Sequence, residues 1–69
     1  MNTPMNQLHA AYAVYVSALA VEIYRGDQPV SSQGRFVCKQ SNYLSILRFA
    51  RNLALHRHLP LYNYAQAGV

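Results

Sequence analysis

The pattern of apolar and polar positions predicts a long helix in the N-terminal third of the chain. Apolar side chains recur at three- and four-residue spacing from Met5 onward, which predicts a helix over about residues 4–25. Thr3 is suited to the N-cap and Pro4 to the first helical position, where its missing N–H costs nothing. Gly26 stands where a helix commonly ends.

A second helix is predicted over about residues 42–58, between Ser41 as its N-cap and the helix-breaking Pro60. Its apolar residues cover an arc of about 160° on a helical wheel, which is the width expected of a face that packs on a core. The residues of this face are Phe49, Leu53, Ile46, Ala50, Tyr43, Ala54 and Leu47.

Between these two segments, residues 26–34 contain Pro29 and two glycines and are expected to form an exposed loop. Residues 35–40 have an extended character. The predicted fold is therefore mainly α, a single small domain over residues 1–69 with two helices joined by a loop and an extended segment. The alternative is an α+β fold with a small hairpin at about residues 20–39, which would shorten the first helix.

The predicted first helix is apolar almost all the way round, because the first 21 residues contain no Asp, Glu, Lys or Arg. Such a helix has to be covered on more than one side. A ridge of small residues on one side would let another helix approach closely. This pattern predicts a homodimer whose interface comprises Ala10, Ala13, Val14, Ser17, Ala20, Val21 and Tyr24.

Size and composition support association with a partner. A chain of 69 residues has a small core, and such chains usually gain stability from disulfides, metals or oligomerisation. Cys38 is the only cysteine, so an intrachain disulfide and a cysteine-rich zinc site are both excluded. The lone thiol and the lack of a basic N-terminal region favour a cytoplasmic location. The stretch Leu8–Tyr24 is too short and too polar for a membrane span.

The net charge of +4 arises from six Lys and Arg residues, all between Arg25 and Arg57, against two acids. The far side of the predicted second helix combines arginine with leucine and has no acid. Arginine beside apolar residues is typical of protein interfaces, and tyrosine is a favourable contact residue there. The predicted protein-binding residues are Leu44, Arg48, Arg51, Leu55, His58, Tyr62 and Tyr64.

Catalytic and cofactor signatures are absent from the sequence. His56 and His58 point about 200° apart on a helix, so they cannot share a metal ion. Two acids are too few for paired-carboxylate chemistry, and the three glycines are isolated, so no phosphate-binding loop is present. We therefore expect a protein that is not an enzyme and has neither cofactor nor metal.

The predicted function is that of a small non-enzymatic regulator that binds and inhibits a larger protein. A component of the transcription machinery is the expected target, because acidic proteins linked to nucleic acid attract small basic ones. Short chains of this kind are often accessory proteins of phages or plasmids. The alternative is a small nucleic-acid-binding protein or transcriptional regulator, in which Asn42, Ser45 and Asn52 would contact bases alongside the arginines. We expect these three residues to lie to one side of the helix, away from Arg48 and Arg51, and for this reason a protein partner is preferred.

Overall fold

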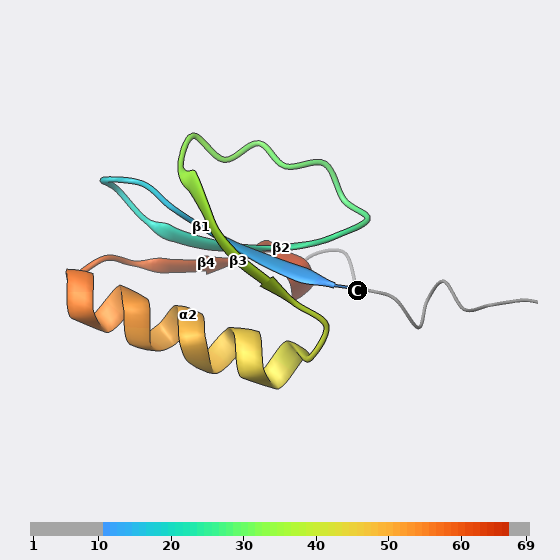
Figure 1. The fold of residues 1–69 in the computed structure, drawn as a ribbon. Coiled ribbons are helices and arrows are strands. Elements are labelled where there is room, and N and C mark those ends of the chain that lie inside the picture. Colours follow the sequence, from blue (N-terminus) through green and yellow to red (C-terminus); the bar gives the residue numbers. More distant parts are fainter. Residues whose placement is uncertain (1–10, 67–69) are drawn as a thin grey trace, which may run out of the picture.

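The computed structural model describes residues 11–66 and shows one α-helix packed on one face of a four-stranded sheet (Figure 1). The fold is therefore α+β, and the prediction of a mainly α protein with two helices is wrong. The elements in chain order are β1 (Tyr12–Val16), β2 (Val21–Arg25), β3 (Arg35–Gln40), α2 (Tyr43–Arg57), β4 (Leu61–Asn63) and the 3-10 turn η1 (Tyr64–Gln66).

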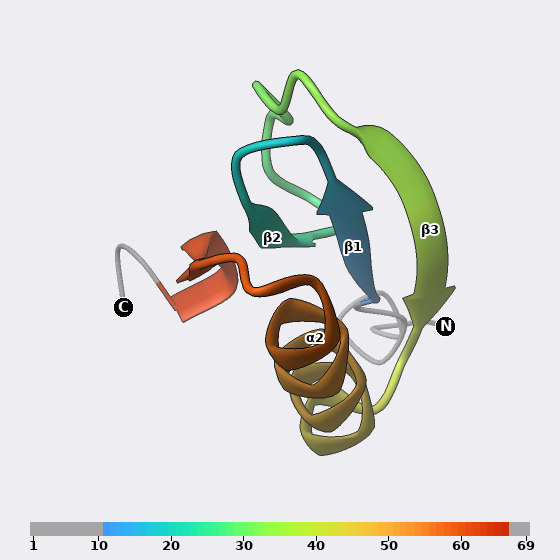
Figure 2. The same cartoon turned by 90° about the vertical axis from the view of Figure 1, so that its left-hand side faces the viewer.

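The strand order is β3-β1-β2-β4, so the hairpin of β1 and β2 forms the centre of the sheet. β3 adds antiparallel to β1, and β4 adds parallel to β2. α2 lies across one face of this mixed sheet, and the loop between β2 and β3 lies on the other side (Figure 2). The parallel edge is possible because α2 carries the chain back along the sheet before β4 begins.

The segment expected to form the first helix is a β-hairpin wherever the structure describes it. Val16 pairs with Val21 across a turn in which the Ser17 hydroxyl accepts hydrogen bonds from the backbone N–H groups of Leu19 and Ala20, at 3.1 and 3.3 Å. Leu19, at the tip of this turn, is 80% exposed. The proposed helix start at Thr3 and Pro4 lies outside the described residues.

Two features of this segment favour strands over the predicted helix. Tyr12, Val14 and Val16 alternate with residues of the other face, as Val21 and Ile23 do, and this period of two belongs to strands. β-branched residues also favour strands. The Ser17 hydroxyl stabilises the turn that joins these two runs of alternating inward- and outward-facing residues.

The hairpin considered at residues 20–39 is not formed either. β3 is extended as the alternative required, but it pairs with β1 and not with β2. A β-bulge occurs in this pairing, because Val14 lies opposite Cys38 whereas the next residue, Tyr15, lies opposite Phe36. The bulge leaves Val37 without a partner and brings Phe36 to the same face as Tyr15.

The second predicted helix, about residues 42–58, corresponds to α2. Its N-cap is Asn42 instead of Ser41: the Asn42 Oδ1 accepts a hydrogen bond from the Ser45 N–H at 3.0 Å. The helix ends at His58, which adopts the left-handed conformation with φ 57°. The C-terminal N–H groups of His58 and Leu59 bond back to the carbonyls of the last turn.

The core lies between α2 and the facing side of the sheet. Val14, Val21, Ile23 and Ile46 are the largest fully buried side chains. Ala50 and Ala54 are also buried, and their small size lets the helix approach the strands closely. Phe49 was predicted to lie on the core face of the helix, but it is exposed.

Candidate protein-binding site

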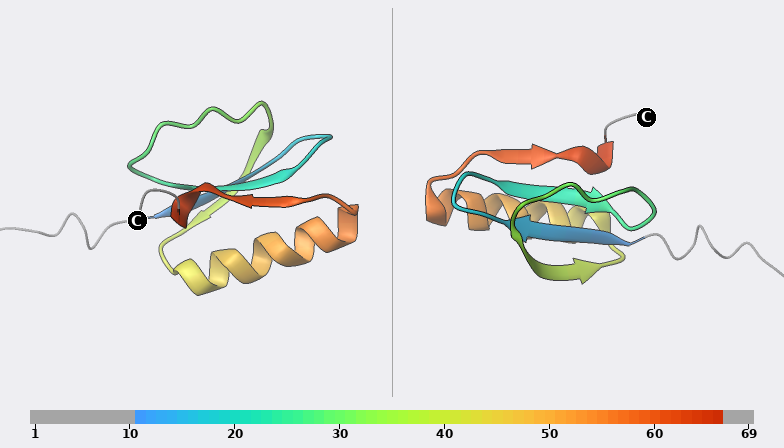
Figure 3. Two further views of the ribbon diagram at one scale, coloured as in Figure 1. Left: turned by 180° about the vertical axis from the view of Figure 1, so that it is seen from behind. Right: turned by 90° about the horizontal axis from the view of Figure 1, so that it is seen from above.

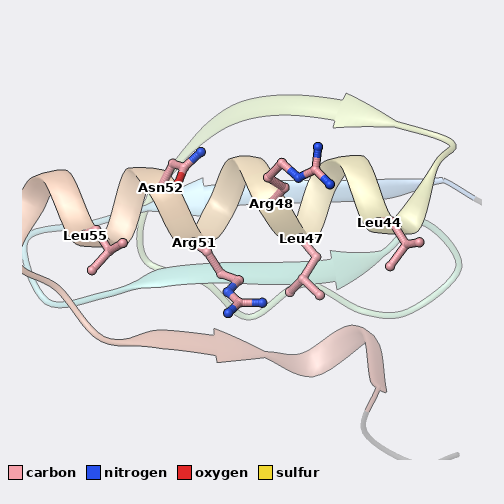
Figure 4. A pocket seen from close by; sticks show the side chains of 6 residues that line it. All are labelled: Leu44, Leu47, Arg48, Arg51, Asn52 and Leu55. Carbon is pink, nitrogen blue, oxygen red and sulfur yellow. The ribbon is translucent and has the colours of Figure 1, made fainter.

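The outward face of α2 presents a row of exposed leucines with two arginines between them (Figure 4). Leu44 and Leu55 are 69% and 74% exposed. Arg48 and Arg51 lie between them in sequence, and all four residues line one shallow hollow of about 380 Å³. The structure thus brings four of the predicted protein-binding residues together on one surface.

Two further residues of this hollow, Leu47 and Asn52, were not among the predicted binding residues. Leu47 was assigned to the core face; it is half-buried and contributes both to the core and to the hollow. Asn52 was expected to lie away from the arginines, but it lines the same hollow. Leu47 lies at the edge of the apolar arc, where a helical wheel does not separate buried from exposed residues. Asn52 is four positions from Arg48 and therefore shares its helix face, so the expectation for Asn52 was wrong.

A second hollow of about 370 Å³ continues this surface toward β4. Arg51 and Leu55 line both hollows, and Leu59 and Leu61 extend the second one. Helical spacing does not predict this continuation, because Leu59 and Leu61 follow the helix and come to lie beside Arg51 and Leu55 through the left-handed turn at His58. The two hollows together form one continuous surface along α2, which is apolar except for the arginines and Asn52 and has Arg51 in both hollows.

The charged side chains on this surface are all positive. α2 contains no Asp or Glu. Among residues 11–66 the ion pair is Arg25 with Asp27, at 2.8 Å between Nε and Oδ1, so neither Arg48 nor Arg51 has an acid within reach there. Unpaired guanidinium groups beside apolar side chains form a surface suited to a partner that offers both carboxylates and apolar groups.

The other three predicted protein-binding residues lie elsewhere. His58 caps the end of α2. Tyr62 is the strand partner of Glu22, between residues that face α2, so Tyr62 lies on the opposite face of the sheet. Tyr64 stacks on Tyr24, with ring centroids 5.1 Å apart. The tyrosines therefore cannot act together with Arg48 and Arg51 on one flat surface.

The predicted dimer interface depends on a helix, but its residues form the β1–β2 hairpin wherever the structure describes them. Val14, Ala20 and Val21 are buried within the chain, as are Ala13 and Tyr24 on the other face of the sheet. The Ser17 hydroxyl holds the β1–β2 turn. Ala10 lies outside the described residues. Because these residues form strands and a turn instead of one ridge, we do not propose association through them.

The helix-free face of the sheet carries aromatic rings, which is the feature that sequence reasoning missed. Neighbouring rings lie 5.1–6.2 Å apart between centroids. In order across the sheet they are Phe36, Tyr15, Tyr24, Tyr64 and Tyr62. Period-two alternation places Tyr15 on this face, opposite the core-facing Val14 and Val16. Phe36 reaches the same face only through the β-bulge, because strict alternation would put it on the side of Cys38, which packs on the core.

The described residues offer little for metal or thiol chemistry. No three His, Cys, Asp or Glu side chains within residues 11–66 are grouped as metal ligands. Cys38 is half-buried against the core, and burial raises the pKa of its thiol, which disfavours the reactive thiolate. No helix in this part of the chain is long and apolar enough to cross a membrane.

These features define a small α+β protein with an apolar, basic helix face on one side and an aromatic sheet face on the other. Comparisons with protein-family models, curated proteins and solved structures gave no match.

Proposed function

We propose that the protein is a small non-enzymatic regulator that binds a larger protein through the outward face of α2 and inhibits it by covering a functional surface. The observation that carries this proposal is the hollow between Leu44 and Leu55, lined by Arg48 and Arg51. Large apolar side chains exposed this fully, at the two ends of a basic hollow, are typical of contact surfaces.

The dimensions of the surface indicate the shape of the partner. Leu44 and Leu55 are three helical turns apart, or about 16 Å along the axis. A helix or a short extended segment of the partner could cover this length, with apolar side chains against the leucines and carboxylates toward Arg48 and Arg51. Components of the transcription machinery with acidic surfaces remain the class of target that we expect.

A nucleic-acid partner is the second candidate, and one observation favours it. Asn52 lines the same hollow as Arg48 and Arg51, so an amide and two guanidinium groups could meet bases and phosphates together. Asn42 is less suited, since its side-chain oxygen caps the helix. The exposed Leu44 and Leu55 have no role in phosphate binding, and we therefore favour a protein partner.

Affinity capture from cell lysate, with and without nuclease, tests the two candidates. The charge variant is Arg48→Ala/Arg51→Ala, and its matched control is Arg35→Ala/Lys39→Ala, which removes the same charge from β3. The apolar variant is Leu44→Ser/Leu55→Ser, and its control is Leu19→Ser in the β1–β2 turn.

We expect one stoichiometric protein that is retained after nuclease treatment, lost with both α2 variants and kept with both controls. Loss of all captured protein after nuclease would favour the nucleic-acid candidate. Equal loss with the Arg35/Lys39 control would show that total charge, and not the α2 face, governs binding.

A further inference from the structure

The aromatic face of the sheet is only partly open. Tyr24, in the middle of the row of rings, is 4% exposed. Its hydroxyl lies 3.5 Å from the Ser31 hydroxyl, in the loop between β2 and β3 that passes over this side of the sheet (Figure 3). The open part on the β4 side consists of Tyr62 and Tyr64, which are 47% and 39% exposed.

The two open rings are held in place by their neighbours. Tyr64 stacks on the buried Tyr24 ring at 5.1 Å between centroids, and Gln28 donates from its Nε2 to the Tyr64 carbonyl at 3.3 Å. The Tyr62 and Tyr64 rings lie 6.2 Å apart and are tilted by 42°. Together they present two adjoining aromatic faces whose positions are largely fixed before any ligand arrives.

Glu22 lies beside these rings. It is the strand partner of Tyr62 in the parallel pairing of β2 and β4, and its Oε1 accepts a hydrogen bond from the Tyr24 hydroxyl at 3.3 Å. The chain has two acids. Asp27 is paired with Arg25, whereas Glu22 has no cationic side chain within 4.0 Å among residues 11–66.

We propose that Glu22, Tyr62 and Tyr64 form a binding site for a guanidinium group, supplied by an arginine side chain of a partner protein. A guanidinium group stacks on the negative face of a tyrosine ring and bonds to a carboxylate through two N–H groups at once. The site offers both contacts side by side, in a protein that is otherwise basic.

The electrostatics of the site act in the same direction. Desolvation and the nearby charge of Glu22 raise the pKa of the Tyr64 hydroxyl, so this part of the surface disfavours an additional negative charge. The negative charge of Glu22 favours a cation bound there. On this face of the sheet, Lys39 lies on β3, at the edge opposite β4. Arg25 donates to the Ala65 carbonyl, next to Tyr64, at 3.0 Å, and it is already paired with Asp27.

This charge arrangement disfavours single-stranded nucleic acid as the ligand of the face. Binding of bases on aromatic rings depends on cations placed along the backbone path, and Glu22 stands beside the open rings instead. The proposed site also lies on the opposite face of the sheet from α2, so it does not depend on the protein-binding function proposed for Arg48 and Arg51.

The experiment is an NMR titration of the full chain with the peptide acetyl-Gly-Arg-Gly-Arg-Gly-amide. Its control is the same peptide with citrulline in place of arginine, which is similar in shape but uncharged. We expect saturable shifts of the Tyr62 and Tyr64 ring protons with the arginine peptide and none with the citrulline peptide. Arg48→Ala/Arg51→Ala should leave the titration unchanged.

Four variants locate the site. Glu22→Gln and Tyr62→Ala should each raise the Kd of the peptide roughly two- to fivefold, the range of one exposed ion pair or cation–π contact. Asp27→Asn removes the same charge as Glu22→Gln elsewhere and should leave the Kd unchanged. Tyr62→Phe keeps the ring and should also leave it unchanged.

Equal shifts with the citrulline peptide, or equal Kd values for Glu22→Gln and the wild type, would overturn the proposal. The same titration with an oligothymidylate tests the nucleic-acid reading. Saturable shifts of the same rings that become stronger in Glu22→Gln would overturn the arginine site in favour of nucleic acid, whereas no shift supports it.

Discussion

The Asn63 side chain donates a hydrogen bond from its Nδ2 to the Tyr43 hydroxyl, at 2.6 Å. This contact joins β4 to the first residue of α2, twenty positions earlier in the chain. The Tyr43 ring also meets Tyr12 of β1 edge to face, with centroids 5.1 Å apart. The Asn63 Oδ1 accepts from the Ala65 N–H at 3.1 Å, so one amide side chain links the helix start to the turn that follows β4.

Removal of the Tyr43 hydroxyl should therefore destabilise the fold without changing the core. We expect Tyr43→Phe to lower the free energy of unfolding by about 1 kcal/mol, because the Asn63 amide loses a part-buried acceptor. Urea denaturation followed by circular dichroism measures this loss. Tyr62→Phe is the control, since the Tyr62 hydroxyl has no hydrogen-bond partner among the described residues, and a loss of equal size there would contradict the interpretation.

Ile46 is the central contact between α2 and the sheet, and it is fully buried. Ile46→Ala should lower the free energy of unfolding by about 2–5 kcal/mol, since it leaves a cavity between the helix and the strands. On the outward face of the same helix, Leu55→Ala should change it by no more than about 0.5 kcal/mol. Comparable losses for both variants would show that the outward face is also packed.

Gly34 allows β3 to begin close to the end of β1. A Cβ atom at this position would lie 2.5 Å from the Val16 carbonyl oxygen, which is backbone and cannot rotate away. We expect Gly34→Ala to cost about 1–3 kcal/mol of stability, since the strands must move apart. Gly26→Ala, where the nearest atom is 3.2 Å away, should cost less in the same denaturation experiment.

Stability should fall at alkaline pH through the thiol of Cys38. Burial raises the pKa of this thiol above its ordinary value of 9.0, so the folded state holds the proton more tightly than the unfolded state. The resulting stabilisation is complete below the unfolded pKa and is lost as the pH rises through the folded pKa. Cys38→Ala should make the free energy of unfolding less steep with pH above 9.0. An unchanged slope would mean that the thiol is solvated.

The α2 helix could be predicted from the sequence because its information is local. Its apolar residues repeat with helical spacing, and Pro60 prevents its continuation. The grouping of Arg48 and Arg51 with Leu44 and Leu55 follows from the same geometry, since residues three or four positions apart share a helix face. For the same reason, the candidate protein-binding site could be located before the structure was known.

The hairpin could not be separated from a helix by spacing alone. The residues from Tyr12 to Ile23 satisfy a stripe of three- and four-residue spacing and also an alternation of period two. Pairing with β3 and β4 decides between them, since those strands supply the hydrogen bonds that a sheet needs. Both partners are distant in sequence, and the pattern within the segment contains no information about them.

The sequence by itself determined α2, its basic and apolar outward face, and the absence of an intrachain disulfide, because each depends on nearby residues or on composition. Only the tertiary structure decided which side of β2 faces the core and which strands adjoin it. The parallel pairing of β4 places Tyr62 beside Glu22, and the bulge in β3 turns Phe36 toward Tyr15. The aromatic face therefore arises from strand register, which is set by packing against α2 and not by any local preference of its residues.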